Sequence, residues 1–247
     1  MSTFSVIVAA AGSGTRFDSG NQKKTYALLA GKPLWQHSVE RFAARDDVAQ
    51  ILIVVSPDDE SWFAETHAEI LAANAAKVVA GGSERFLSVG NALAKVNPDL
   101  EFVAVHDAAR PCVSEAMLER VFSTARLHGN AIPAIPVSST LKRSASGTSV
   151  DQTVDRSQLY QSQTPQVFRT EVLKEAYAKL GDEKPTDEAQ LMETQGHSVF
   201  LAEGCALNRK ITTQQDLLFA EAAISVLNKS NVEPVHFDGP IKDTRLS

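Results

Sequence analysis

The chain lacks several features that would place it in common classes of protein. Its 247 residues include only two cysteines, Cys112 and Cys205, which excludes a disulfide framework and a cysteine zinc site and favours reduced thiols in a cytoplasmic protein. No apolar run reaches the ~18 residues of a membrane span, and no basic stretch precedes the apolar N-terminal segment, so no signal peptide is predicted. A net charge of −6 argues against a nucleic-acid-binding protein, which normally presents a basic face.

The positive charge that is present gathers in a few short motifs. An acidic protein that binds an anionic substrate must concentrate its cations locally, and nearly half of the 24 lysines and arginines lie in the motifs described below. These eleven residues are Arg16, Lys23, Lys24, Lys32, Arg85, Arg110, Lys142, Arg143, Arg156, Arg209 and Lys210.

Strand and helix patterns alternate along the chain, which predicts an α/β fold with a mostly parallel sheet covered on both faces. With 43% hydrophobic residues, the chain can bury the core of one α/β domain or two, and we predict a single domain over residues 1–247. The predicted strands are Phe4–Ala9, Gln50–Val55, Lys77–Ala80, Glu101–His106, Ala131–Pro136 and Val199–Ala202. The predicted helices are Leu34–Ala44, Glu84–Ala94, Glu115–Leu127, Glu171–Leu180, Asp187–Thr194 and Gln214–Leu227.

Two segments depart from this alternation. Residues 137–158 are polar and rich in Ser and Thr, with β-type runs on either side of Gly147, which predicts a hairpin arm too polar to enter the core. Such an arm is either a flexible excursion or a device that grips a second subunit. Residues 229–247 show no helical period and are predicted to form an irregular tail, after a last helix whose start carries a capping-box pattern, Thr213 to Asp216.

The most informative segment is the loop after the first predicted strand. Residues 9–18 read Ala-Ala-Ala-Gly-Ser-Gly-Thr-Arg-Phe-Asp, so a buried strand opens into a loop whose backbone N–H groups are unobstructed. Such N–H groups bind phosphates, and the nearby cations Arg16, Lys23 and Lys24 suit a polyphosphate. We therefore predict a nucleotide-binding protein, although Gly12-x-Gly14 taken alone is equally compatible with an ordinary strand–helix turn.

Two better-known phosphate motifs are excluded by their own requirements. A dinucleotide fingerprint needs a third small residue after Gly12 and Gly14, but Phe17 occupies that position. A P-loop ends in Gly-Lys-Ser/Thr, and the Gly31-Lys32 pair is followed by Pro33.

Two further motifs follow predicted strands, where an α/β fold places its ligands. The segment Gly81–Ser88 opens a helix, and its glycines allow close approach of the backbone to an anion, although a plain turn fits too. The segment His106–Pro111 closes an apolar strand. Asp107 is a natural Mg²⁺ ligand beside a triphosphate and Arg110 could hold a second phosphate, while an ion pair between the two is the alternative. His106 is predicted to be structural.

The remaining motifs lie in the second half of the chain. They are Thr153–Arg156 in the arm, Thr164-Pro165-Gln166, Thr186-Asp187-Glu188 and Asn208–Thr212. Thr186 also fits a helix N-cap, and Lys210 also fits a surface lysine.

The ordered set of motifs closely resembles the 2-C-methyl-D-erythritol 4-phosphate cytidylyltransferase family of the non-mevalonate isoprenoid pathway. The resemblance covers roughly residues 4 to 227, and eight motifs match in order, from the glycine loop and Lys24-x-Tyr26 to Lys210-Ile211-Thr212. It implies a Rossmann-like sheet of the nucleotide-diphospho-sugar transferase type, CTP and a polyol phosphate as substrates, Mg²⁺ as cofactor, and a homodimer whose arm supplies Arg156 to the partner's site.

The resemblance also implies a role for each matched residue. The catalytic residues would be Arg16, Lys24, Arg156 and Lys210. The nucleotide would be held by Ala10, Ala11, Gly12, Gly14, Gly82, Ser83 and Ser88. The acceptor substrate would contact Asp107, Arg110, Thr140, Thr164 and Thr186, and Asp107 would also bind the metal.

Departures from the family pattern leave alternatives open. Lys23 precedes Lys24 where a proline is usual, so Lys23 is a possible substitute, and Ser139 stands where an acid is common. The acceptor could be another polyol phosphate, such as ribitol 5-phosphate, as in a sister family with the same loop. A nucleotide-binding regulatory module without turnover is the alternative from another class.

Overall fold

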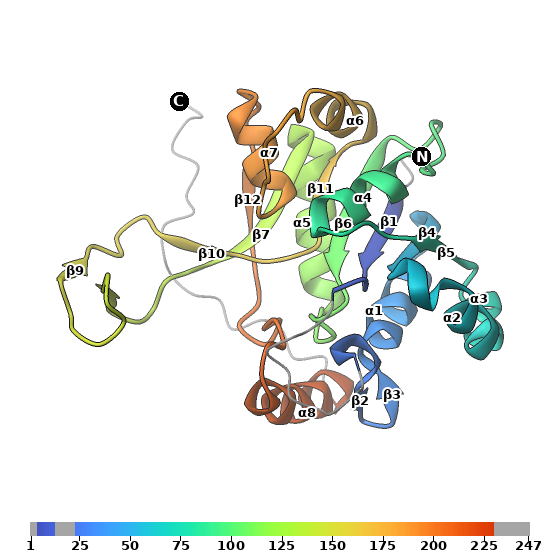
Figure 1. The fold of residues 1–247 in the computed structure, drawn as a ribbon, viewed down its shortest axis with the longest axis horizontal. Coiled ribbons are helices and arrows are strands. Elements are labelled where there is room, and N and C mark those ends of the chain that lie inside the picture. The colour runs from blue at the N-terminus through green and yellow to red at the C-terminus, as the bar shows by residue number, and fades with distance from the viewer. Residues whose placement is uncertain (1–3, 13–22, 230–247) are drawn as a thin grey trace.

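Eight strands form one mixed sheet in the computed structural model, which describes residues 4–12 and 23–229 (Figure 1). They are β1 (Phe4–Ala9), β4 (Val48–Val55), β5 (Ala76–Ala80), β6 (Phe102–Asp107), β7 (Asn130–Pro136), β10 (Tyr160–Ser162), β11 (Gln166–Arg169) and β12 (Phe200–Glu203). Their order is β10-β7-β11-β6-β1-β4-β5, with β12 paired to β7. Strands β6, β1, β4 and β5 are parallel, while β11 runs antiparallel to both β6 and β7.

Helices cover both faces of the sheet, because the central strands are apolar on both sides. Along β1, Val6 and Val8 face one layer and Ile7 faces the other, and all three are fully buried. The first layer contains α1 (Leu34–Ala43), α2 (Glu60–Thr66), α3 (Ala68–Ala73) and α5 (Glu115–His128), and the second contains α4 (Arg85–Leu93), α6 (Thr170–Ala178) and α7 (Glu188–Thr194). No helix in the described part of the chain is long and apolar enough to cross a membrane.

The carboxyl ends of β1 and β6 define the crevice in which this fold class binds ligands. From β1 the sheet grows through β4 and β5 on one side and β6 on the other, which makes the edge between β1 and β6 a topological switch point. Ala9 is in register with Asp107, and the N–H of Ala108 donates to the Ala9 carbonyl at 3.1 Å. The glycine loop after β1 and the Asp107 motif after β6 therefore leave the sheet side by side.

A third, smaller apolar cluster lies beside this crevice. Helix α8 (Gln214–Lys229) packs Ala220 and Ile224 against Leu29 and Leu34, and buried Ile211 joins them. The hairpin of β2 (Leu28–Leu29) and β3 (Lys32–Pro33) leads into this cluster. It therefore joins the segment after Lys24 to the segment that carries Lys210.

The predicted capping box at the start of α8 is present. The N–H of Thr213 donates to Asp216 Oδ2 at 2.9 Å, and the N–H of Asp216 donates back to Thr213 Oγ1 at 3.3 Å. The helix includes Lys229, so the predicted irregular tail does not start at 229, and the rest of it, residues 230–247, lies outside the described residues.

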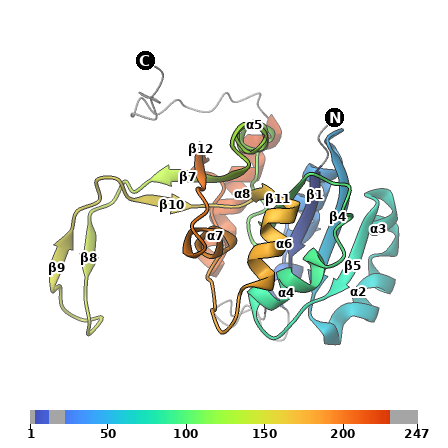
Figure 2. The ribbon, with the colours of Figure 1, turned by 90° about the horizontal axis from the view of Figure 1, so that it is seen from above.

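The polar segment 137–158 forms the predicted hairpin arm. Strands β8 (Leu141–Arg143) and β9 (Gln152–Val154) pair antiparallel, with Leu141 opposite Val154. Figures 1 and 2 both show this arm extending well beyond the edge of the central sheet. Its side chains are mostly exposed, as the polar composition predicts.

All the predicted strands and helices are present with no end shifted by more than two residues, but six α-helices and strands of the described residues were not predicted: α2, α3, β2, β3, β10 and β11. Helices α2 and α3 were missed because each buries a single side chain, Phe63 and Leu71, and so has almost no apolar period. Strand β10 has only exposed side chains, and β11 is four residues long.

Candidate functional site

A cavity of 620 Å³ opens at the carboxyl edge of the sheet, where the glycine loop begins. Ala11 and Gly12 line it, while Ala10 lies buried beneath, its N–H bonded to the Val54 carbonyl at 2.8 Å. The hydroxyl of Thr25 donates to the Ala10 carbonyl at 3.2 Å, which ties the two ends of the loop together. Gly14 and Arg16, predicted to bind nucleotide and to catalyse, lie outside the described residues.

The two neighbouring lysines after this loop differ in environment. Lys23 Nζ forms an ion pair with Asp59 Oδ2 at 2.5 Å, and the Tyr26 hydroxyl donates to the same oxygen at 2.7 Å. Lys24 lines the large cavity, whereas Lys23 is not among the described residues that do. This arrangement favours Lys24 over Lys23 as the lysine that meets a ligand.

A second loop, Gly81–Ser83, forms the opposite wall. The Gly82 N–H donates to Ser88 Oγ at 3.0 Å, and that hydroxyl donates to the Glu84 carbonyl at 3.0 Å. Gly82, Ser83 and Ser88, which are predicted to hold the nucleotide, all line the cavity. Ser88 therefore fixes the shape of the loop as well as contributing to the wall.

Glycine is required at position 81 because neighbouring atoms leave no room for a side chain. A Cβ there would lie 2.7 Å from Ser88 Oγ and 3.0 Å from the Val55 carbonyl oxygen. We expect Gly81→Ala to lower the free energy of unfolding by about 1–3 kcal/mol, the usual cost of overpacking, as measured by urea denaturation. Gly12→Ala is the control, since a Cβ at Gly12 would meet no atom of the described residues within 4 Å. Equal stability losses in the two variants would contradict this explanation.

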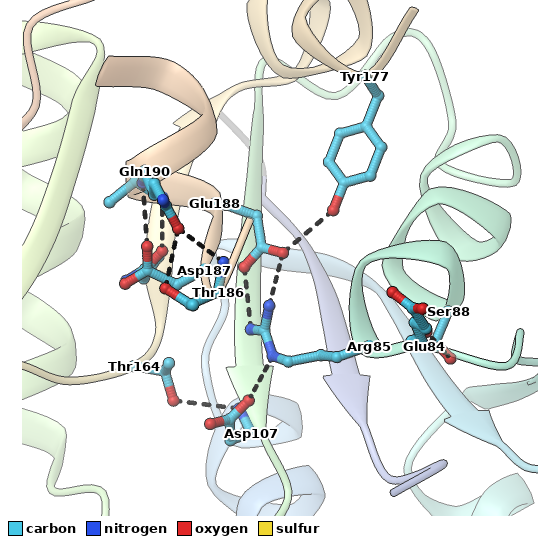
Figure 3. A network of polar contacts seen from close by, with 12 residues as sticks. Glu84, Arg85, Ser88, Asp107, Thr164, Tyr177, Thr186, Asp187, Glu188 and Gln190 are labelled. Atoms are coloured by element: carbon cyan, nitrogen blue, oxygen red, sulfur yellow. Dashed lines mark hydrogen bonds and ion pairs between the residues drawn. The ribbon is translucent and has the colours of Figure 1, made fainter. Parts of the chain in front are cut away.

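Asp107 occupies the centre of the site between two cations. Its Oδ2 accepts from Lys210 Nζ at 2.7 Å. Its Oδ1 accepts from Arg85 Nε at 3.1 Å, and its N–H donates to Thr164 Oγ1 at 3.1 Å (Figure 3). Burial alone would raise the pKa of the Asp107 carboxyl, but the charges of Arg85 and Lys210 outweigh burial and hold that pKa well below its usual range. Asp107 is therefore ionised at every physiological pH.

His106 is part of the supporting structure, as predicted. Its ring is fully buried, with Nδ1 3.1 Å from Thr164 Oγ1 and Nε2 3.2 Å from Ser38 Oγ. Burial lowers the pKa of His106 to about 4, so the ring is neutral at pH 7. It positions Thr164, which in turn holds the backbone of Asp107.

A smaller cavity of 140 Å³ adjoins the first and contains the predicted acceptor-binding residues Arg110, Thr164 and Thr186. Arg110 is fixed by a bond from Nη1 to the Asn208 carbonyl at 2.8 Å. Thr186 is not the cap of α7: Asp187 is, because its Oδ1 accepts from the Gln190 N–H at 2.9 Å. The Thr186 hydroxyl instead donates to Gln190 Oε1 at 3.0 Å.

Lys210 lies at the boundary of the two cavities because the next residue, Ile211, anchors this segment. The N–H of Ile211 donates to the Ala109 carbonyl at 2.8 Å, and the Ile211 side chain is fully buried in the small cluster beside α8. Arg85, Asp107 and Lys210 each line both cavities. The site is therefore two cavities joined at one charged group of three residues.

The comparisons with known proteins agree with this geometry. A family model described as 2-C-methyl-D-erythritol 4-phosphate cytidylyltransferase matches residues 4–226. The chain belongs to this family. A cytidylyltransferase of that name from Rhodopirellula baltica is 46% identical over 232 residues, which cover 90% of this chain and 94% of the relative. A chloroplastic one from Oryza sativa is 35% identical, with 88% of this chain and 73% of the relative covered.

Solved structures show the same likeness. A crystal structure titled 4-diphosphocytidyl-2C-methyl-D-erythritol synthase matches with a TM-score of 0.77 at 31% identity, covering 91% of this chain and 99% of that one. The cytidylyltransferase from Thermus thermophilus matches with a TM-score of 0.76 at 31% identity, covering 91% of this chain and all of the other. The expected nucleotidyltransferase fold is thus confirmed.

Within one chain, most of the residues expected from the cytidylyltransferase family line the two cavities, but of those that the structure describes Ala10, Thr140 and Arg156 do not. The large cavity gathers Ala11, Gly12, Lys24, Gly82, Ser83, Ser88, Asp107 and Lys210, and the small one gathers Asp107, Arg110, Thr164, Thr186 and Lys210. Thr140 and Arg156 are exposed in the arm and are not among the described residues that line either cavity.

Sequence reasoning missed the partners that hold these cytidylyltransferase residues in place. Glu188 is 1% exposed and pairs with Arg85, although its position in the first turn of α7 predicts a solvated acid. Asp59, which holds Lys23 and Tyr26, lies in a segment with no recognisable motif. The two residues of the first pair are 103 positions apart, and no sequence signal joins them.

Proposed function

We propose that the chain catalyses the reaction for which its family is named. The phosphate of 2-C-methyl-D-erythritol 4-phosphate attacks the α-phosphate of CTP, giving 4-diphosphocytidyl-2-C-methyl-D-erythritol and pyrophosphate. The observation that carries this proposal is the pair of joined cavities, one large enough for a nucleotide and a smaller one lined by Arg110 and Lys210. Two phosphates bound in them would meet beside Asp107.

The chemistry requires charge neutralisation more than proton transfer. The attacking phosphate has a second pKa of about 6 and is largely dianionic at pH 7, so it needs no general base. Because an anion must approach an anion in line, catalysis depends on positioning and on fixed cations. We assign Arg16 and Lys24 to the α-phosphate and the departing pyrophosphate, and Lys210 and Arg156 to the attacking phosphate.

The residues around Asp107 limit how a Mg²⁺ ion could be bound there. In the described part of the chain, no group of three or more His, Cys, Asp or Glu residues is placed to hold a metal ion. Both oxygens of Asp107 accept from cations, although each carboxylate oxygen can accept more than one bond. The residues therefore fit an ion that is held chiefly by the phosphates of the nucleotide, with Asp107 as its carboxylate ligand. Such an ion would supply further positive charge to the triphosphate.

The arm supports the proposal of a homodimer. Thr140 and Arg156 are exposed residues of the arm, which extends away from the body (Figure 2), and neither is among the described residues that line the two cavities. In a two-fold dimer, each arm would reach the partner's site, so that both sites are built from both chains. The cytoplasm remains the predicted location.

Pyrophosphate release tests the substrates. With 2-C-methyl-D-erythritol 4-phosphate as acceptor, we expect CTP to be used far better than ATP, because backbone groups of the glycine loop after β1 and of Gly81–Ser83 would hydrogen-bond the edge of a pyrimidine base. With CTP as donor, ribitol 5-phosphate is expected to be a poor acceptor. Comparable rates with CTP and ATP would refute the role of these two loops, and preference for ribitol 5-phosphate would refute the acceptor.

A further inference from the structure

Glu188 is a buried carboxylate whose partners are specific. It is 1% exposed, and its two oxygens accept from Arg85 Nη1 and Nη2 at 2.8 and 2.9 Å. The Tyr177 hydroxyl donates to Glu188 Oε1 at 3.1 Å. A buried carboxylate is costly unless it is paired in this way. Glu188 is not among the described residues that line the two cavities, so it acts on the site through another residue.

Arg85 is that other residue. The bidentate pair fixes the plane of its guanidinium, because the donors of arginine form a rigid fork. The third nitrogen of the guanidinium, Nε, then donates to Asp107 Oδ1 at 3.1 Å (Figure 3). Glu188 thus determines where Arg85 holds the Asp107 carboxylate.

The position of Asp107 in turn determines that of Lys210. Lys210 Nζ lies 2.7 Å from Asp107 Oδ2, and its side chain is 41% exposed, so this ion pair is its fixed contact at the boundary of the cavities. Arg85 and Lys210 share one carboxylate, and Glu188 supplies Arg85 with a second. Without the charge of Glu188, Asp107 is the only carboxylate paired with Arg85, and the carboxylate is drawn towards Arg85 and away from Lys210.

We propose that Glu188 is a positioning residue for the transfer step, which through Arg85 and Asp107 holds the Lys210 ammonium where the two bound phosphates react. This inference rests on the proposed function, since it assigns Lys210 to the attacking phosphate. It predicts an effect on turnover rather than on nucleotide binding.

Glu188→Gln tests the proposal, because it removes the charge and keeps the shape. We expect kcat to fall about 10- to 100-fold, as when the outer partners of other functional side chains are removed. The KM for CTP is expected to stay within about twofold, since the glycine loops are untouched. Wild-type pyrophosphate release is measured first, and its absence would refute the proposed function rather than the role of Glu188.

A double-mutant cycle with Lys210→Ala separates positioning from a purely structural role. If Glu188 acts through Lys210, then Glu188→Gln costs less than about threefold in kcat once Lys210 is already alanine. The proposal would be overturned if the loss of kcat in the double variant equalled the product of the two single losses. A kcat of Glu188→Gln within twofold of wild type would also overturn it. Should Glu188→Gln fail to fold, Arg85→Lys enters the same cycle, because an ammonium keeps the charge but cannot hold both carboxylates in a fixed fork.

Tyr177→Phe is the matched control for stability. It removes one hydrogen bond to Glu188 but leaves the bidentate pair with Arg85 in place. We expect a lower melting temperature with kcat within about twofold of wild type. A kcat that falls in step with melting temperature in both variants would show a structural role only and would overturn the proposal.

Discussion

Lys24→Ala and Lys210→Ala are each expected to lower kcat by about 10²–10³-fold, the usual loss when one preorganised charge is removed from a site of this kind. Both lysines line the large cavity, and Lys210 also lines the small one. Their charges are placed before the substrates bind, so little reorganisation is needed as charge develops on the transferring phosphate. Initial rates of pyrophosphate release at saturating CTP and acceptor measure the effect.

Lys23→Ala is the matched control for these variants. Lys23 differs from Lys24 by one position and is engaged by Asp59 outside the cavity lining, so its loss is expected to change kcat by less than about tenfold. Unfolding curves for all three variants check that the fold persists. A fully active Lys24→Ala together with an inactive Lys23→Ala would place the catalytic lysine one residue earlier.

Mixing two inactive variants is expected to restore activity, if each site is built from both chains. Lys24→Ala chains and Arg156→Ala chains, unfolded and refolded together, pair at random, so about half of the dimers are mixed. In a mixed dimer one site receives both defects and the other receives neither. About a quarter of all sites are then intact, and activity rises to about that fraction of wild type.

The control for this experiment is each variant refolded alone, which is expected to stay nearly inactive. If Arg156 acts in the site of its own chain, every site in the mixture keeps one defect and activity does not recover. An absence of recovery, with mixed dimers confirmed by mass, would refute the shared site.

The central strands and the loops after β1, β5 and β6 were predictable, because each of these strands is a short, mainly apolar run that either ends at a charged residue or is followed within three residues by a glycine. Val6, Ile7 and Val8 are buried on both faces, and the segments after β1, β5 and β6 all reach the cavity. The alternation of strands and helices was sufficient to place these segments at one edge.

Contacts between distant side chains were not predictable by the same reasoning. The pair of Arg85 and Glu188 depends on how α4 and α7 pack on the same face of the sheet, and the polar sequence around Glu188 equally fits an exposed helix start. Helices α2 and α3 show the same limit, because one buried side chain in each leaves no period to detect. Family resemblance predicts which residues carry the chemistry, whereas the residues that support them follow only from the packing of the fold.

The small apolar cluster beside α8 has a consequence for how the enzyme would lose activity. It holds Ile211 next to Lys210, and it also contains Ala27 and Leu29, which follow Lys24 closely. The segments that carry the two lysines therefore pack in one cluster, which is separate from the two large cores of the sheet. A cluster with so few members belongs to the regions of a protein that open first. Loosening it would spread the two ammonium groups apart at once, so inactivation would precede melting of the sheet.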